Sequence, residues 1–375
     1  MTMSGCTRRK LLGTGALTAI GSVAGCTVRW GGNGSSGESD VDAVPEIPRV
    51  QNPPDAVYVP THREAMRHLP IVEAGEYALS PMLTYPHSFW LVTGTEREEV
   101  IPDGGRDVHL MVTVWDAETG QVLPVDAGAT MRVLKDDEIV DQRAPWPMIS
   151  QTMGFHFGDN VPLSEDGTYT VEVDLNPIEV RKTGGFADRF EERATASFEF
   201  EYDDEFRQEV TDGVEYLDES DWGRRGAIAP PMGMDGHGDD DHDHGDHHMP
   251  FSALPEADTY PGTDLGGHES GDARFVIRYR SDSRFADGGY LLVFPRTPYN
   301  QVPLADMSLS VAGDVETDLV QTLDSELGLH YGAEVDLFGG QTFDLTVDGP
   351  PQVSRHAGYE TAFLEMPSMR VEAPE

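Results

Sequence analysis

The sequence has almost no cysteine and very little lysine, and both shortages exclude classes of protein. The only cysteines in the 375 residues are Cys6 and Cys26, both near the N-terminus. The rest of the chain therefore has no internal disulfide and no thiolate metal site. The only lysines are Lys10, Lys135 and Lys182, and acidic residues bring the net charge to −41. A surface of this charge repels phosphate backbones, so nucleic-acid partners are excluded.

Motifs of the common enzyme classes are also missing. The sequence has no Gly-rich phosphate loop and no nucleophile elbow, so nucleotide hydrolysis and serine hydrolysis have no support. We predict no catalytic residues and no enzymatic activity. A composition rich in Asp and Glu with almost no Lys resembles that of extremely halophilic archaeal proteins. Most of the carboxylates are then expected to form a solvated coat.

The first residues have the layout of an export signal. "TRRKLLGTGALTAIGSVAGC" contains paired Arg8 and Arg9, a short apolar run and small residues that end at Cys26. We predict a signal over 1–25, because the run is short for a membrane span. The arginine pair resembles a twin-arginine signal, and the last four residues resemble a lipobox. That resemblance implies lipidation of Cys26 and a lipid-anchored protein on the extracytoplasmic face of the membrane; the alternative is an uncleaved anchor.

The body of the chain is predicted to be all-β. The Gly/Ser/acid-rich stretch from 26 to 50 is interpreted as a flexible tether. Short segments with period-two alternation follow, which is typical of antiparallel β-sandwiches. We place a first sandwich at 51–203 and a second at 269–375. The expected strands are 107–114, 168–175, 195–202, 274–280, 289–295, 307–311 and 341–349.

The stretch 204–268 between the sandwiches is interpreted as a linker. Its first part predicts a short helix. Later it contains an Asp/His tract of low complexity that builds no core. Neutral imidazoles and carboxylates on such a chain bind divalent metals with modest affinity, whereas the alternative is an ordinary acidic loop. The tract histidines are His237, His242, His244, His247 and His248.

A histidine turn occurs twice. "GFHFGDNVPL" begins at residue 154 and "GLHYGAEVDL" at 328, so His156 aligns with His330 at an offset of 174 residues. Thr168 and Thr342 keep the same offset. We interpret this as a duplicated domain; the alternative is chance similarity between two Gly-rich strand starts.

A group of histidines and methionines in the first copy predicts a metal site. His109 and Met111 are two residues apart on a strand and share the face opposite its valines. Met148, Met153 and His156 follow within nine residues, in a segment that we expect to be a loop. Imidazole with thioether suits copper, and imidazole with carboxylate suits iron, manganese or zinc. The alternative is that these methionines fill core gaps and the histidines are ordinary hydrogen-bonded side chains.

"WPMISQTMGFHFGDNVPLSEDGTYTVEVDL" and "DVHLMVTV" resemble the motifs of the periplasmic iron-transport proteins, which are accessory proteins of iron uptake. The resemblance covers about 75–202, and 270–365 more weakly. It implies immunoglobulin-like sandwiches that bind copper or iron near a dimer interface, with His109, Met148 and His156 matching the family's ligands. Met111 stands in place of the family's Glu. The late histidine of the family is absent from the first copy, but the second copy has His356, which together with His330 suggests a second site.

These observations predict a lipid-anchored protein that aids iron or copper acquisition. Metal would be captured by the Asp/His tract, held at the first sandwich and handed to a membrane permease. One alternative is a structural or adhesive surface lipoprotein without tight metal. Another is a copper chaperone or copper redox protein.

Overall fold

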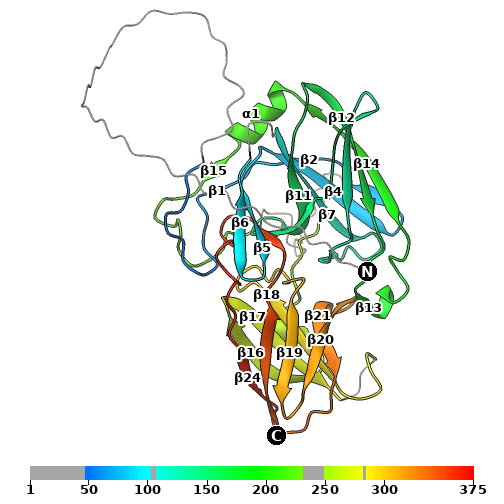
Figure 1. Cartoon of the computed structure of the whole chain (residues 1–375), viewed down its shortest axis with the longest axis vertical. Coiled ribbons are helices and arrows are strands. Elements are labelled where there is room, and N and C mark those ends of the chain that lie inside the picture. Colours follow the sequence, from blue (N-terminus) through cyan, green and yellow to red (C-terminus); the bar gives the residue numbers. More distant parts are fainter. Residues whose placement is uncertain (1–46, 103–106, 231–248, 282–283) are drawn as a thin grey trace, which may run out of the picture. The chain divides into compact units, whose positions relative to one another are not determined.

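The computed structural model describes residues 47–102, 107–230, 249–281 and 284–375 (Figure 1). These residues form an all-β, immunoglobulin-like structure, as predicted. The expected signal, Cys26 and the five tract histidines lie outside the described residues.

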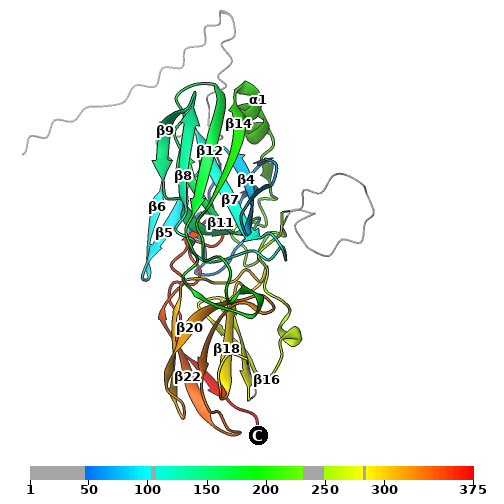
Figure 2. The ribbon, with the colours of Figure 1, turned by 90° about the vertical axis from the view of Figure 1, so that its right-hand side faces the viewer.

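The first sandwich consists of a nine-stranded and a four-stranded sheet, which form two layers (Figure 2). The strands of the large sheet, in their order across it, are β2 (Arg67–His68), β4 (Tyr77–Thr84), β7 (Val108–Asp116), β11 (Gly154–Val161), β10 (Trp146–Ser150), β23 (Ser354–Arg355), β5 (Phe89–Thr93) and β6 (Glu96–Val100), with β3 (Val72–Ala74) also paired to β4. The small sheet contains β14 (Ala194–Tyr202), β12 (Gly167–Leu175), β8 (Thr130–Lys135) and β9 (Glu138–Arg143).

Period-two alternation explains how the two layers pack. On β12 and β14 the apolar residues are buried while the acidic residues between them face outward. The apolar residues of β7 and β11 join them in one core. A buried tyrosine adds a feature of immunoglobulin-like sandwiches: Tyr169 donates its hydroxyl hydrogen to the backbone oxygen of Glu165 at 2.6 Å.

The second sandwich shares part of this strand order, although its strands form one nine-stranded sheet. Its strands pair in the order β16 (Thr263–Ser270), β17 (Ala273–Arg280), β18 (Tyr290–Arg296), β21 (Gly328–Glu334), β20 (Thr317–Asp324), β19 (Ser308–Gly313), β22 (Thr342–Gly349) and β24 (Met369–Glu372), with β13 (Arg181–Thr183) also paired to β20. The order β17-β18-β21-β20 matches β4-β7-β11-β10 of the first sandwich. The four strands around the histidine turn therefore have the same order in both halves of the chain, while the duplication itself stays a prediction.

Each copy gives one short strand to the other. β23, from the second half of the chain, pairs in parallel with β10, while β13, from the first half, pairs in parallel with β20. The two copies are therefore joined through their sheets. The second sheet also begins at Thr263, earlier than the predicted boundary at 269, so the end of the expected linker is part of β16.

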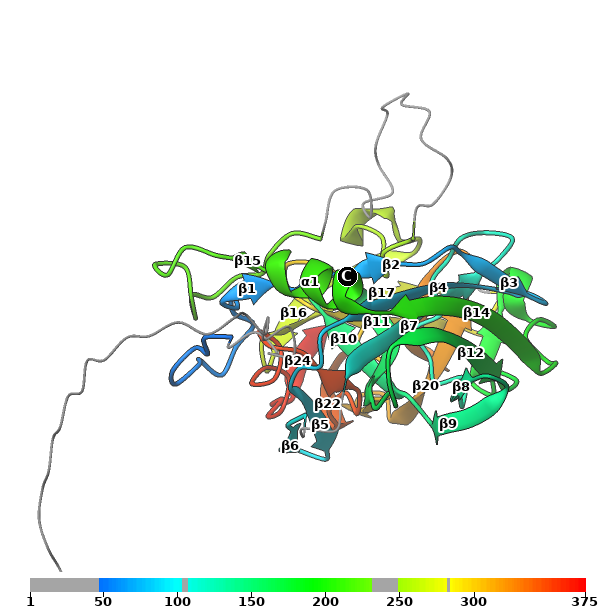
Figure 3. The ribbon, with the colours of Figure 1, turned by 90° about the horizontal axis from the view of Figure 1, so that it is seen from above.

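The rest of the expected linker contains short elements. The predicted helix is α1 (Asp204–Asp212), which Asp203 caps by accepting a hydrogen bond from the backbone N–H of Phe206. The helix contacts β2 and β14 (Figure 3). The remaining elements are β1 (His62–Arg63), which pairs with β15 (Glu215–Tyr216), and the 3-10 turns η1 (Gly184–Phe186) and η2 (Ala257–Thr259). Within the described ranges, no helix is long and apolar enough to cross a membrane.

One local prediction is wrong. Met148 and His156 were expected in a loop, but they lie in β10 and β11, which form an antiparallel hairpin. The connecting turn is residues 151–153, directly before Gly154 with its positive φ of 67°. This conformation is easy for glycine and strained for other residues. The turn therefore ends before Gly154, and of the three residues expected in the loop only Met153 lies in it.

Candidate metal centre

The candidate centre lies on the face of the nine-stranded sheet that points away from the sandwich core. The apolar residues that alternate along β7 face the core, so His109 and Met111 face the other side. In the β10–β11 hairpin, Met148 and His156 are directly opposite each other. Strand alternation and hairpin register therefore bring four of the five predicted ligands to adjacent strands, and all four are buried.

Gly158 leaves space between three of these side chains. It is opposite Met111 in the pairing of β11 with β7. A Cβ at Gly158 would lie 3.1 Å from Nε2 of His109 and 3.3 Å from Sδ of Met148. A nitrogen donor and a thioether donor thus border the same small space, which only glycine leaves open.

Hydrogen bonds determine which imidazole nitrogen faces the centre. Nδ1 of His156 lies 3.2 Å from the backbone oxygen of Gly154, and Nδ1 of His109 lies 3.0 Å from Oδ1 of Asn160. Both oxygens accept hydrogen bonds, so each Nδ1 carries the hydrogen and each Nε2 presents a lone pair. Metal-binding histidines in proteins are commonly oriented in this way.

A third histidine has the same arrangement. Nδ1 of His87 lies 3.2 Å from the backbone oxygen of Ser88. Asn160 connects His87 to His109, since its amide also accepts from the backbone N–H of His87 and donates to the His87 backbone oxygen. The two imidazole centroids are 4.2 Å apart. Nε2 of His87 and Nε2 of His109 are both buried without a hydrogen-bond partner among the described residues.

The fourth histidine comes from the exchanged strand. His356 directly follows β23, and its Nε2 lies 3.2 Å from Nε2 of His156. Two nitrogens at this separation, each bonded to one ion at about 2.05 Å, subtend an angle of roughly 100°, which is near tetrahedral. The two nitrogens share a hydrogen bond, and their separation is also that of two donors on a single ion, which would replace that hydrogen.

Burial keeps these imidazoles neutral. It lowers the pKa of His87, lowers that of His156 to about 4, and lowers those of His109 and His356 well below the usual value. The neighbouring histidines lower the pKa of His356 further. A neutral imidazole is the metal-binding form, so the cluster needs no deprotonation at neutral pH to bind an ion.

The other predicted methionines lie at the edge of the centre. Met111 and Met153 pack in a small apolar cluster with Met82 and Trp115. They also border a small hollow that His87 and His356 line. They form its apolar wall, whereas Met148 presents its sulfur beside His109.

The carboxylate of Glu64 forms a group with His87 and His356 on the side of the centre that faces a cavity. The ligand atoms of Glu64, His87 and His356 all lie within 4.8 Å of one another. Glu64 and His87 also line a cavity of about 390 Å³, which borders the histidine cluster. Oxygen and nitrogen donors therefore lie between this cavity and the inner side chains.

The predicted second site does not form. His356 contacts the histidines of the first copy, and His330 lies among the rings of Phe285, Tyr290 and Phe294. Nδ1 of His330 makes the same bond as in the first copy, to the backbone oxygen of the glycine two residues earlier, at 3.3 Å. Burial lowers the pKa of His330 to about 4. The turn is retained, but His330 belongs to no group of three or more His, Cys, Asp or Glu ligands among the described residues.

Three members of the cluster were not assigned from sequence. His87 was left open because its aromatic surroundings in "LTYPHSFW" fit simple packing equally well. Glu64 and Asn160 have no local signal that separates them from the other polar residues. His356 was noticed but placed in the second copy, because the exchange of β23 cannot be read from strand patterns.

Comparisons with known proteins give one family model over part of the chain and solved structures of low sequence identity. A family model described as a domain of unknown function, DUF7350, matches residues 258–372. A search of curated proteins gives no match. Two solved structures of FetP from uropathogenic E. coli strain F11 are similar at 20% identity. The as-isolated form is covered over 96% of its length by 36% of this chain, with a TM-score of 0.29. A copper-bound variant is covered over 97% by 38% of this chain, with a TM-score of 0.28.

Proposed function

We propose that this protein binds a copper or iron ion outside the cytoplasm and serves in acquisition of that metal. The observation that carries the proposal is the convergence of buried, neutral imidazoles around Met148. Three of them have Nδ1 bonded to an oxygen acceptor, which leaves Nε2 available as a donor. Nε2 of His87 and Nε2 of His109 are buried without a partner among the described residues, which is costly unless they gain a ligand.

The donor set favours copper among the two candidates. Thioether sulfur is a soft donor that selects Cu(I), while imidazole accepts copper, iron and zinc. Met148 and His156 face each other across the hairpin, and Sδ of Met148 borders the same space as Nε2 of His109. Iron would use the imidazoles together with the Glu64 carboxylate on the outer side.

The metal is cargo in this proposal, and the chain has no assigned catalytic residue. The Asp/His tract captures ions at modest affinity, the buried cluster retains them, and a membrane permease receives them. Lipidation at Cys26 would keep the protein at the extracytoplasmic face of the membrane, close to the permease. Radioactive metal uptake by cells with and without the gene, under metal limitation, tests the acquisition step.

A matched pair of variants tests the centre itself. His156→Ala removes a central donor, while His330→Ala removes the same residue from the equivalent turn of the second copy. We expect the wild type to hold Cu(I) tightly. His156→Ala should weaken it by more than about a hundredfold, beyond the usual cost of losing an outer-shell partner. His330→Ala should bind as the wild type.

Competition with a chromogenic Cu(I) chelator measures these affinities, and circular dichroism confirms that both variants fold. Equal metal binding by His156→Ala and the wild type would contradict the proposal. A wild type without tight metal would instead favour a structural surface lipoprotein.

A copper chaperone or copper redox protein is the second candidate, and Met148 is the observation that favours it. Redox cycling of bound copper with turnover of a substrate would separate this function from acquisition. A chaperone would transfer Cu(I) to a soluble acceptor in the absence of a permease.

A further inference from the structure

The large cavity and the small hollow share two side chains. Glu64 and His87 line both spaces, while His356 lines the small hollow. An ion that enters the cavity therefore meets Glu64 and His87 before it reaches the nitrogens of His109 and His156. These shared side chains stand where an incoming cation would first be held.

We propose a second, outer cation position formed by Glu64, His87 and His356, through which metal passes to the inner position at His109, Met148 and His156. The proposal rests on the proposed function and adds the route and order of binding. The two positions meet at His356, since its Nε2 lies 3.2 Å from Nε2 of His156.

The side chains around Glu64 leave its carboxylate available for an ion. Its nearest basic neighbour is His62, with Nε2 4.0 Å from Oε1 of Glu64. His62 is itself engaged, since Nε2 lies 2.8 Å from the hydroxyl of Tyr85 and Nδ1 lies 3.1 Å from that of Thr61.

The three donors can close on an ion with small movements. Their ligand atoms lie within 4.8 Å of one another. Donors on a tetrahedral ion at about 2.1 Å are roughly 3.4 Å apart, so closure needs shifts of about 1.5 Å or less. Nε2 of His87 is buried without a partner among the described residues, so binding costs it no hydrogen bond.

The two positions differ in chemical character. The outer position offers one carboxylate oxygen and two imidazole nitrogens, which suit divalent ions such as Co(II), Fe(II) or Zn(II). The inner position adds a thioether, which suits Cu(I) or Ag(I). The arrangement predicts that a divalent and a soft monovalent ion can be directed to different positions of one protein.

Co(II) and Ag(I) titrations test this with a matched pair of variants. Glu64→Gln removes the charge and the favoured ligand oxygen. Glu99→Gln makes the same change on the wall of the same cavity, where the carboxylate is paired with Arg49 at 2.6 Å. All proteins carry Asn at the five tract histidines, so that the tract takes no Co(II).

We expect Glu64→Gln to weaken Co(II) binding, followed by its d–d absorption, at least tenfold. Ag(I) binding, followed by calorimetry, should change less than twofold, and Glu99→Gln should change neither. Met148→Leu should give the reverse pattern, with Ag(I) weakened and Co(II) retained.

The outcomes separate the two proposals. If the starting protein binds neither ion, the proposed function and the outer position both fail. If it binds Ag(I) tightly but Glu64→Gln leaves Co(II) affinity unchanged, the outer position alone is wrong. If Glu64→Gln and Glu99→Gln weaken Co(II) equally, the effect is general cavity charge and the ligand assignment is again wrong.

Discussion

The β10–β11 and β20–β21 hairpins have the same turn, but only the first collects metal donors. In both, a glycine with positive φ begins the second strand, and the histidine two residues later bonds back to that glycine's oxygen. Yet His156 faces His356, and His330 faces aromatic rings. The same turn therefore holds a histidine beside other imidazoles in the first copy and beside aromatic rings in the second. The residues on the neighbouring strands determine whether that histidine is near other metal donors.

The strand registers identify those neighbours. Thr322 stands opposite His330, where Met148 stands opposite His156. In β18 the residues at the positions of His109 and Met111 are Tyr290 and Leu292. A Cβ at Gly332, the counterpart of Gly158, would lie 2.5 Å from the Tyr290 ring. A ring therefore fills the space that remains open between donors in the first copy.

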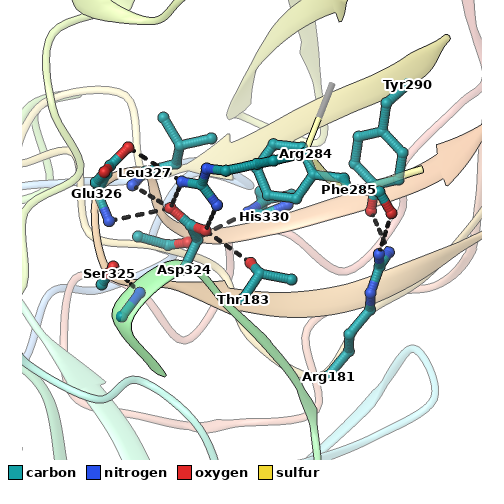
Figure 4. Close-up of polar contacts among 12 residues, drawn as sticks. Arg181, Thr183, Arg284, Phe285, Tyr290, Asp324, Ser325, Glu326, Leu327 and His330 are labelled. Carbon is teal, nitrogen blue, oxygen red and sulfur yellow. Dashed lines mark hydrogen bonds and ion pairs between the residues drawn. The ribbon is translucent and has the colours of Figure 1, made fainter. Parts of the chain in front are cut away.

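In the second copy, charged side chains surround the position that corresponds to the candidate metal centre. Arg284 and Thr183 both donate to the Asp324 carboxylate, and Arg181 donates to the hydroxyl of Tyr290 (Figure 4). The exchanged strand β13 brings Thr183 where β23 brings His356, because Arg181 pairs with Thr322 as Ser354 pairs with Met148. One copy is thus stabilised by an ion-pair network where the other presents metal donors.

The largest expected effect comes from filling the two matched glycines. Gly158→Ala places a methyl group against Nε2 of His109 and Sδ of Met148 and should weaken Cu(I) binding by about a hundredfold. The fold should survive, since those side chains need to give only slightly. Competition with a chelator and thermal unfolding of the same sample check both parts.

Gly332→Ala should instead lower the stability of the fold and leave Cu(I) affinity unchanged. Its Cβ overlaps the Tyr290 ring, so overpacking should cost about 1–3 kcal/mol of unfolding free energy. Cu(I) affinity should stay at the wild-type value. Loss of metal binding in Gly332→Ala with unchanged stability would show that the second copy takes part in metal binding.

A smaller effect is expected from Asn160, which holds His109 and His87. Asn160→Ala removes the acceptor for Nδ1 of His109, so the ring can rotate or change tautomer, and metal affinity should fall about tenfold. Asn160→Asp retains an acceptor and should recover most of the affinity. Cu(I) competition on the two variants measures this, and equal losses would mean that Asn160 acts only through packing.

We expect the Asp324 carboxylate to make the stability of the second copy depend on pH in the acid range. Burial would raise the pKa of Asp324, but hydrogen bonds from Arg284, Thr183 and two backbone N–H groups outweigh it and lower the pKa to about 2. A carboxylate with a lowered folded pKa stabilises the fold above its unfolded pKa of about 3.9. That contribution, about 2–3 kcal/mol at neutral pH, is lost as the pH falls from about 4 toward 2.

Asp324→Asn should therefore unfold at lower urea than the wild type at pH 7, and the gap should narrow below pH 4. Asp344→Asn is the control, because that carboxylate is exposed and pairs at the surface with Arg370. A gap independent of pH would assign the loss to packing instead of charge.

The sequence predicted the fold well because local patterns determine it. All seven expected strands are present, since alternation of apolar and polar residues along β12 or β22 follows directly from burial of one face. One exception is β10, which was taken for a loop because Pro147 is unusual within a strand and the adjacent apolar Met148 and Ile149 break the alternation.

The centre was predicted only in part. His109 and Met111 share one sheet face, as strand spacing predicted. Met148 and His156, which were expected in a loop, lie on neighbouring strands of the same sheet. His356 is 200 residues from His156 and reaches it only through the exchange of β23. Such a contact depends on pairing between distant strands, and no local pattern carries that information.

The smallest effect is expected where the second copy is given the histidine it lacks. Thr183→His places an imidazole at the position that corresponds to His356, beside His330. We expect no additional metal, because Tyr290 fills the space of the missing donor and the guanidinium of Arg181 adds positive charge there. Loss of the bond from Thr183 to Asp324 should lower stability by about 1 kcal/mol.

Metal content after loading with Cu(I), compared between Thr183→His and the wild type, measures the gain directly. A second tightly bound equivalent would show that one histidine is enough to restore the site. An unchanged number of bound ions would mean that the residues on the neighbouring strands, and above all Tyr290, prevent the second copy from binding metal.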